Sequence, residues 1–283
     1  MSNPSTAEMA ALAEWSEAEF MYGLETLAPP SVRARLGIAG TRVGGGVVLA
    51  MRHDPVQYWS KALGFGVTEP VTRDVLDEVV AFYRDQGTPS AVIQIAPQFL
   101  PSDWDEIIAA HALAPVSSWV RLMAPSDRVR PAVNTRLRVG PVGEDDAEEW
   151  ASVLVRGHGM PADGLAEMLL SAFADPSCHP FAVWDGTDVV GGATLSVHDP
   201  VGSLHSASVL PSHRRLGGQT ALIAARAEAA RSLGCRWLAS ETGNLTDGRV
   251  NQSLNNMRRA GLRVQYVRQN WRWRAESSPR GAV

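Results

Sequence analysis

Apolar and polar positions follow a regular order in the second half of the chain. Apolar residues at every second position predict strands, and apolar residues three or four apart predict helices. Together they predict the order β-α-α-β-β-β-α-β-α-β, an α/β domain with a mixed sheet. The predicted strands are residues 135–142, 181–184, 189–197, 204–210, 236–240 and 263–273, and the predicted helices are residues 145–156, 162–173, 219–233 and 252–259.

The first half of the chain shows the same kinds of pattern in a less regular order. Its last third is a strand, a short helix and a strand that carries Trp119, and the second half ends in the same way with Trp271 and Trp273. Two copies of one fold with little sequence identity would produce this repeat. The predicted helices are residues 8–27, 72–86 and 102–113, and the predicted strands are residues 43–51, 57–63, 91–95 and 118–123.

A polar segment with two prolines separates the halves. Residues 124–134 contain Pro125 and Pro131 and have the composition of a linker. The sequence therefore predicts one domain over residues 1–130 and a second over residues 135–283.

Composition limits the classes of function that the chain can have. The 283 residues are 45% hydrophobic and 20% charged, which is typical of a globular protein. The formal net charge of −4 gives no basis for binding nucleic acid, and no apolar run is long enough to cross a membrane. Cys178 and Cys235 lack the spacing of metal ligands, so we expect no metal. A chain with only two cysteines fits a reduced compartment, and the acidic N-terminus shows no secretory signal, so we expect the cytoplasm. No pattern indicates an oligomeric state.

The sequence VLPSHRRLGGQTAL at residues 209–222 joins a predicted strand to a predicted helix. A cationic glycine loop that leads into a helix N-terminus can hold a pyrophosphate, because the first amides of the helix have no partner within it. Gly217 and Gly218 let the backbone approach a ligand closely, and Arg214 and Arg215 add positive charge. The alternative is an ordinary strand-to-helix turn with solvated arginines. The loop lacks the Lys-Ser/Thr pair of a Walker motif and the three spaced glycines of a Rossmann turn.

Arg-x-x-Gly-x-Gln, which starts three residues after Pro211, resembles the acyl-CoA loop of the GNAT N-acetyltransferase superfamily. Residues 241–243, 253–262 and 266–271 resemble the end of a bacterial GNAT branch. In that branch an incomplete N-terminal GNAT-like half precedes a complete C-terminal GNAT domain. The resemblance implies tandem GNAT-like folds with acyl-CoA N-acyltransferase architecture. The matching junction of the first half carries Glu69 and Asp74, which would repel a phosphate, so any coenzyme site belongs to the second half.

The resemblance implies acetyl-CoA as a co-substrate and assigns residues to it. The pantetheine arm would lie where strand 204–210 parts from strand 236–240, and a backbone amide of Val209 or Leu210 would hold the thioester oxygen. Three polar residues further along, Asn251, Ser253 and Asn256, could contact the pantetheine arm or its sulfur. They could equally be caps of the helix that begins there. The coenzyme-binding residues expected are Ser208, Val209, Leu210, Arg214, Arg215, Leu216, Gly217, Gly218, Gln219, Thr220, Asn251, Ser253 and Asn256.

Two residues are candidates for the proton acceptor. His205 stands nine residues before Arg214, where the arylalkylamine branch of the family has a histidine, and an imidazole titrates near neutral pH. Glu241 ends the next strand, although a carboxylate there could simply pair with Arg236 or Arg249. Many family members have a tyrosine as general acid where this chain has Met257, which has no proton to donate.

The resemblance thus implies an N-acetyltransferase in which an amine of a small molecule or peptide attacks acetyl-CoA directly in a ternary complex. The first half would be a scaffold beside the acceptor site, and His158 and Met160 would border that site. Two alternatives stay open. One is a non-catalytic module that binds CoA or a partner, and the other is an acyltransferase that uses a longer acyl-CoA or another donor.

Overall fold

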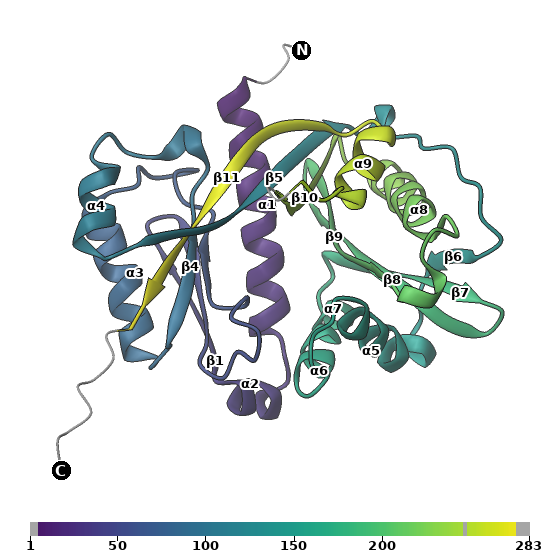
Figure 1. Cartoon of the computed structure of the whole chain (residues 1–283), viewed down its shortest axis with the longest axis horizontal. Coiled ribbons are helices and arrows are strands. Elements are labelled where there is room, and N and C mark those ends of the chain that lie inside the picture. The colour runs from purple at the N-terminus through teal and green to yellow at the C-terminus, as the bar shows by residue number, and fades with distance from the viewer. Residues whose placement is uncertain (1–4, 246–247, 276–283) are drawn as a thin grey trace.

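The computed structural model describes residues 5–245 and 248–275. Within them the strands form one mixed sheet in the order β1-β2-β3-β4-β11-β5-β10-β9-β8-β7-β6. Helices cover its faces, and the long helix α1 (Thr6–Thr26) stands between the two halves (Figure 1). The predicted α/β class with a mixed sheet is therefore confirmed.

The first half contains the predicted elements, two of them altered, together with a helix at Pro30–Leu36 and a strand at Ile38–Val43 that were not predicted. The apolar run 43–51 is not one strand, because Gly44 and Gly45 both have positive φ and turn it into the hairpin of β1 and β2. The predicted strand 57–63 is shorter, because the Asp54 carboxylate accepts hydrogen bonds from three backbone amides and holds residues 54–59 in a turn. The elements after α1 are α2 (Pro30–Leu36), β1 (Ile38–Val43), β2 (Gly46–Met51), β3 (Lys61–Leu63), α3 (Arg73–Asp85), β4 (Ser90–Gln94), α4 (Trp104–Ala110) and β5 (Ala114–Pro125).

The second half has the predicted order of elements. The predicted helix 162–173 is two short helices, because the chain turns between them at Leu170. The elements are β6 (Arg138–Pro141), α5 (Ala147–Gly157), α6 (Leu165–Leu169), α7 (Ser171–Ala174), β7 (Cys178–Asp185), β8 (Asp188–His198), β9 (Val201–Val209), α8 (Gly218–Ser232), β10 (Trp237–Gly243), α9 (Gln252–Arg259) and β11 (Arg263–Arg274), with 3-10 turns at Pro97–Phe99, Ser126–Arg128, Glu144–Asp146 and Pro211–His213.

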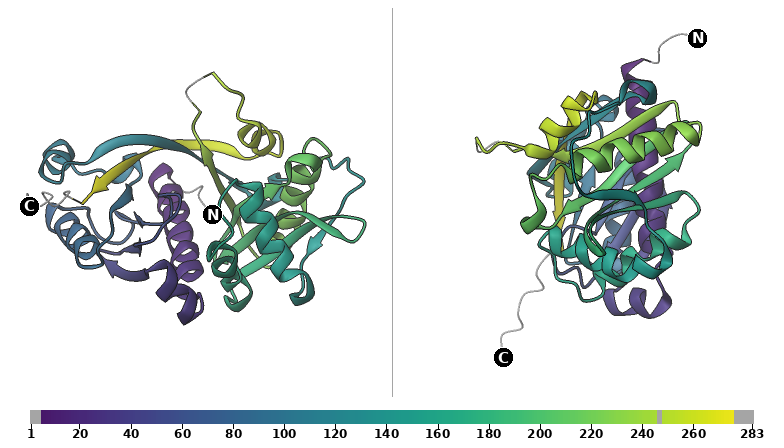
Figure 2. Two further views of the ribbon diagram at one scale, coloured as in Figure 1. Left: turned by 60° about the horizontal axis from the view of Figure 1, so that its bottom comes forward. Right: turned by 90° about the vertical axis from the view of Figure 1, so that its right-hand side faces the viewer.

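The two halves exchange their last strands. β11 lies between β4 and β5 and is antiparallel to both, while β5 lies between β11 and β10. The pair arches across both halves (Figure 2). Each half thus has the last strand of the other half within its own sheet. The predicted division into residues 1–130 and 135–283 stays a prediction about the repeat, since one sheet runs through both segments.

Helix α1 carries buried charges into the centre of the molecule. Glu17 accepts hydrogen bonds from Arg121 of β5 at 2.8 Å and from Arg268 of β11 at 2.8 and 3.1 Å. Glu14 accepts hydrogen bonds from Arg268 and from the Tyr266 hydroxyl, both at 2.6 Å. Buried charges need such partners, and removal of one partner typically costs about 3–5 kcal/mol. These ion pairs fasten α1 to both of the exchanged strands.

Glu25, near the end of α1, is buried without such a partner. Neither of its carboxylate oxygens has a hydrogen-bond partner in the described part of the chain. Burial raises the pKa of Glu25 well above its ordinary value, with the nearby Lys61 opposing this shift and Asp54 adding to it. The folded protein therefore holds this proton more tightly than the unfolded chain does.

We expect Glu25→Gln to stabilise the protein at alkaline pH. The free energy contributed by a carboxyl with a raised pKa falls as pH rises above its unfolded pKa of about 4.3, and the amide removes this dependence. Thermal unfolding of both proteins at about pH 5 and about pH 8 would show a gain for the variant that is larger at the higher pH. Glu78→Gln, on an exposed face of α3, is the control. A gain independent of pH would contradict the assignment.

Candidate functional site

Strands β9 and β10 run parallel and then part. Their pairing covers only Trp237–Ser240 against Val201–Leu204, although β9 continues to Val209 and β10 to Gly243. The last paired position is marked by the Ser240 hydroxyl, which donates to the Leu204 carbonyl at 3.0 Å. Two adjoining cavities open beyond this point. The parting that the family resemblance implied is thus present in the structure.

A bulge shapes β9 beside the opening. The β8–β9 register shifts between the pairs Gly192–Ser208 and Thr194–His205, and Ser206 within the shift has φ of 54°. A bulge leaves backbone groups outside the regular ladder and bends the strand. It therefore bends β9 at the edge of the cavities.

The backbone beyond the bulge distinguishes between the two amides proposed for the thioester oxygen. The Leu210 amide donates to the Val190 carbonyl of β8 at 2.9 Å, so it is not free. Alternate residues of an antiparallel ladder direct their amides to opposite sides, which turns the Val209 amide away from β8 and towards the gap. Val209 is thus the better placed of the two.

The predicted phosphate loop surrounds the outer cavity, which has a volume of about 800 Å³. Helix α8 begins without a side-chain cap, so the first amides of the helix are available to an anion. Gly217 is required, because its φ is 83° and a Cβ there would lie 2.4 Å from the Asn134 carbonyl oxygen. The residues that line this cavity are Gly157, His158, Ala207, Ser208, Val209, His213, Arg214, Arg215, Gly217, Gly218, Gln219, Thr220, Gln252, Ser253 and Asn256.

The structure brings most of the predicted coenzyme residues together and separates three from them. Leu210, Leu216 and Asn251 do not line the outer cavity. Asn251 is the cap of α9, since its side chain accepts a hydrogen bond from the Leu254 amide at 2.9 Å, and its contact with a coenzyme stays a prediction.

Polar side chains of the loop also hold its walls. Arg214 donates to the Val209 carbonyl at 3.2 Å and to the Gly157 carbonyl at 3.1 Å, so its guanidinium ties β9 to the end of α5. Gln219 of α8 hydrogen-bonds to Ser253 at 3.2 Å and to Asn256, which joins α8 to α9. A phosphate would meet a loop whose shape these bonds already fix.

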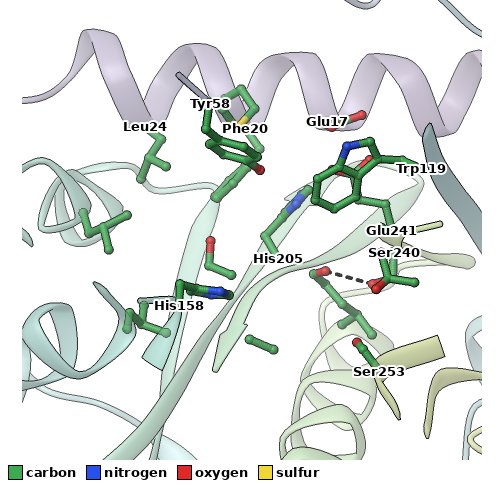
Figure 3. Close-up of a pocket in the computed structure, with 18 of the residues that line it drawn as sticks. Glu17, Phe20, Leu24, Tyr58, Trp119, His158, His205, Ser240, Glu241 and Ser253 are labelled. Carbon is green, nitrogen blue, oxygen red and sulfur yellow. Dashed lines mark hydrogen bonds between the residues drawn. The ribbon is translucent and has the colours of Figure 1, made fainter. Parts of the chain in front are cut away.

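The inner cavity, of about 360 Å³, lies between the two halves. Phe20, Met21 and Leu24 of α1 line it together with aromatic residues that follow β2 or lie on β5. Figure 3 shows Phe20, Tyr58 and Trp119 on the α1 side of the cavity, with His205 beside them. Apolar walls with a few polar groups are typical of a small-molecule site.

His205 lies in this inner cavity, stacked on Phe20 with ring centroids 3.9 Å apart. Its Nε2 has no hydrogen-bond partner in the described part of the protein. Burial lowers the pKa of His205 to about 3, with Glu17 opposing the shift. The imidazole is therefore neutral at physiological pH and, in this environment, a weak proton acceptor.

Glu241 lies on the other wall of the inner cavity. Its Oε2 accepts hydrogen bonds from Arg121 at 2.9 Å and Arg268 at 3.0 Å, rather than from the arginines that the sequence had suggested. Burial and the neighbouring Glu17 raise the pKa of Glu241, while the two arginines oppose the shift. Its negative charge is thus largely neutralised by Arg121 and Arg268, the same two arginines that bind Glu17 of α1.

His158, at the end of α5, lines both cavities. Burial lowers the pKa of His158, the Ser206 backbone opposes this, and the charge of Arg214 adds to it. Met257 also lines the inner cavity. Tyr266 does not, because its hydroxyl is turned towards Glu14. Sequence reasoning missed Arg226, a buried arginine on the wall of the inner cavity, because nothing in its neighbours along the chain marks it.

Among the residues that the structure describes, no group of three or more His, Cys, Asp or Glu side chains could hold a metal ion. No helix among them has the length and apolar character needed to cross a membrane.

Comparisons with known proteins agree with this geometry. Residues 146–248 match the model of the acetyltransferase (GNAT) family. A GCN5-related N-acetyltransferase from Kribbella flavida is 16% identical with a TM-score of 0.62, covering 95% of this chain and 96% of that chain. One from Sphaerobacter thermophilus is 15% identical with a TM-score of 0.58, covering 96% and 94%.

A tandem GNAT protein from the clavulanic acid biosynthesis pathway is 12% identical with a TM-score of 0.54, covering 98% of both chains. No curated protein matches the sequence. At 12–16% sequence identity, similarity to these solved structures is evidence about the fold alone. Together with the matched segment they confirm the family resemblance and the fold predicted from the sequence.

We expect Gly217→Ala to weaken coenzyme A binding at least tenfold, which is about 1.4 kcal/mol. A methyl group there meets the Asn134 carbonyl and strains the backbone, so the loop must move. Isothermal calorimetry with coenzyme A measures the effect. Gly234→Ala is the matched control, because Gly234 has φ of 82° and open space around its Cβ position. Equal losses of affinity in both variants would contradict the phosphate assignment.

Proposed function

We propose that this chain, whose C-terminal half is a GNAT domain within a tandem GNAT fold, is an N-acyltransferase that transfers acetyl from acetyl-CoA to an amine. One observation carries the proposal. Two adjoining cavities extend from the uncapped start of α8 to the place where β9 and β10 part, and the inner one is largely apolar. The two cavities share His158, Ala207, Gln219 and Ser253.

The outer cavity suits the coenzyme part of the donor. The pyrophosphate would bind the free amides of the 214–220 loop, with Arg214 and Arg215 contributing charge. The pantetheine arm would follow β9 as an added strand. The Val209 amide would then donate to the thioester oxygen as negative charge develops on it.

The residues that line the two cavities favour direct attack of the amine on the thioester over a mechanism in which the acetyl group is first transferred to an enzyme cysteine. Neither Cys178 nor Cys235 lines the two cavities. Burial also raises the pKa of Cys178 to about 12, which leaves its thiol protonated and unreactive. Both substrates would therefore be bound together when the amide bond forms.

The inner cavity favours an acceptor with one amine on a flat apolar body. Phe20, Tyr58, Trp59 and Trp119 supply aromatic walls. Its two carboxylates, on α1 and β10, are already paired with arginines, so they cannot neutralise additional positive charges of a polyamine or an aminoglycoside. The first half of the chain, which provides most of the aromatic wall, is thus a scaffold that selects the acceptor.

An amine panel tests both the activity and this preference. Thiol release from acetyl-CoA would be measured with 2-phenylethylamine, spermidine, an aminoglycoside and phenylalanine, and products identified by mass spectrometry. We expect 2-phenylethylamine to react at least about tenfold faster than spermidine or the aminoglycoside, and phenylalanine shows whether a carboxylate on the same body is accepted. Faster reaction of a polycation would contradict the proposed acceptor class.

The panel also tests the alternative of a module that binds coenzyme without catalysis, which Met257 favours because it lacks an acidic proton. Calorimetric binding of acetyl-CoA without thiol release from any amine would favour that alternative. Absence of binding would contradict the proposed donor itself.

The pH dependence of the reaction distinguishes the candidate bases. Since burial lowers the pKa of His205 to about 3, we expect no inflection from this residue near neutral pH. Instead kcat/KM should rise with pH through the pKa of the acceptor amine and move when an amine of different pKa is used. His205→Asn should lower kcat and keep the shape of the profile. A neutral inflection that disappears in the variant would identify His205 as the base.

A further inference from the structure

Arg226 is a buried arginine without an acidic partner. It lies on the face of α8 that also presents Gln219 and Ile223 to the inner cavity, and its exposed fraction is 1%. No carboxylate of the described residues lies within 4.0 Å of its nitrogens. Buried charges are normally paired, so an unpaired one inside a cavity needs an explanation.

Three main-chain carbonyls hold the Arg226 guanidinium in place. Nη1 donates to the Thr194 carbonyl at 3.0 Å and to the His205 carbonyl at 3.2 Å, which are the register partners beside the bulge of β9. Nε donates to the Leu222 carbonyl at 3.1 Å. Carbonyl dipoles stabilise the cation and leave its full charge uncompensated. Burial lowers the pKa of Arg226 to about 9, so the group is charged at neutral pH.

The other ionisable groups on the cavity wall do not cancel this charge. Glu17 and Glu241 pair with the arginines of β5 and β11, which also bind Glu14, and the nearby Lys61 supplies the third positive charge of this group. Burial lowers the pKa of both His158 and His205, which favours neutral rings. Burial also raises the pKa of Tyr58, so its hydroxyl is neutral. Among the lining residues that the structure describes, the uncompensated charge is the cation on α8.

The proposed reaction produces an anion at the inner cavity. The amine nitrogen forms a bond to the thioester carbonyl carbon, the carbon–sulfur bond breaks, and its electron pair leaves on sulfur as a thiolate. The extra proton of the nitrogen passes to solvent, and the thiolate takes a proton from solvent on release. Met257, beside the same cavity, has no proton to give to the sulfur.

We propose that Arg226 stabilises the coenzyme A thiolate by its charge and so replaces a general acid. This inference rests on the proposed function. Its second effect is positional, because the same guanidinium holds the two carbonyls at the bulge that precedes Val209. Only the charge effect changes the acidity of a bound thiol.

The test is the pKa of the coenzyme A thiol bound to the full-length protein, followed by the ultraviolet absorbance of the thiolate during a pH titration. An opposite charge nearby lowers a pKa by about 1–3 units, so we expect the bound thiol to ionise at least about one unit below free coenzyme A. An unshifted or raised pKa in the unmodified protein would overturn the proposal without any variant.

Variants separate charge from shape. Arg226→Lys keeps a cation and should retain most of the shift, whereas Arg226→Met should abolish it and lower kcat about tenfold or more. Arg231→Met is the control, because Arg231 also lies on α8 and donates to main-chain carbonyls, those of Ser126 and Val129, outside the cavity. A normal thiol pKa shift in Arg226→Met would overturn the proposal. If that variant does not fold, the unmodified protein and Arg226→Lys decide.

Failure of the proposed function has a different signature. If coenzyme A does not bind, calorimetry shows no heat and the donor assignment fails. If it binds and its thiol is acidified but no amine reacts, the catalytic proposal fails and the role of Arg226 towards the thiolate stands.

Discussion

The buried ion pairs between α1 and the exchanged strands are the interaction on which the rest of the structure depends. Glu17 bridges Arg121 and Arg268, and these arginines also bind Glu241 of β10. One cluster therefore joins a helix of the first half to three strands at the centre of the sheet. Charges of this kind are costly to bury unless every member finds partners, which makes the arrangement of these elements specific.

The same cluster determines the electrostatics of the inner cavity. Its arginines neutralise Glu17 and Glu241, two lining residues whose negative charges would otherwise attract cations into the cavity. With Glu14, which also binds Arg268, the cluster has three acids. Lys61, whose ammonium lies 3.5 Å from the ring centroid of Tyr58, adds a third base to the two arginines. Under the proposed function, stability and acceptor choice are thus coupled, because any change that frees one of these carboxylates also alters the charge of the cavity wall.

Local patterns and distant pairings differed in how well the sequence predicted them. The loop that starts α8 was predictable, because Pro211, Arg214 and Gly217 lie within seven residues and the geometry they need is local. The ion cluster was not, since Glu17 and Arg268 are 251 positions apart and each alone reads as an ordinary surface residue. His205 was a candidate base from the sequence, but its neutral state depends on burial against Phe20 of the other half, which no local pattern reveals. Arg226 gave no signal, because its partners are backbone carbonyls, which every sequence contains.

The exchanged strands have a consequence for how the chain comes to be folded. The sheet of the first half needs β11, which is synthesised only after β6 to α9 of the second half. During synthesis that half must wait with β4 and β5 unjoined, although most of its core residues have already emerged. Unpaired strand edges invite wrong partners, including a second nascent chain. Emergence of β11 is therefore the event that allows both halves to complete their sheets.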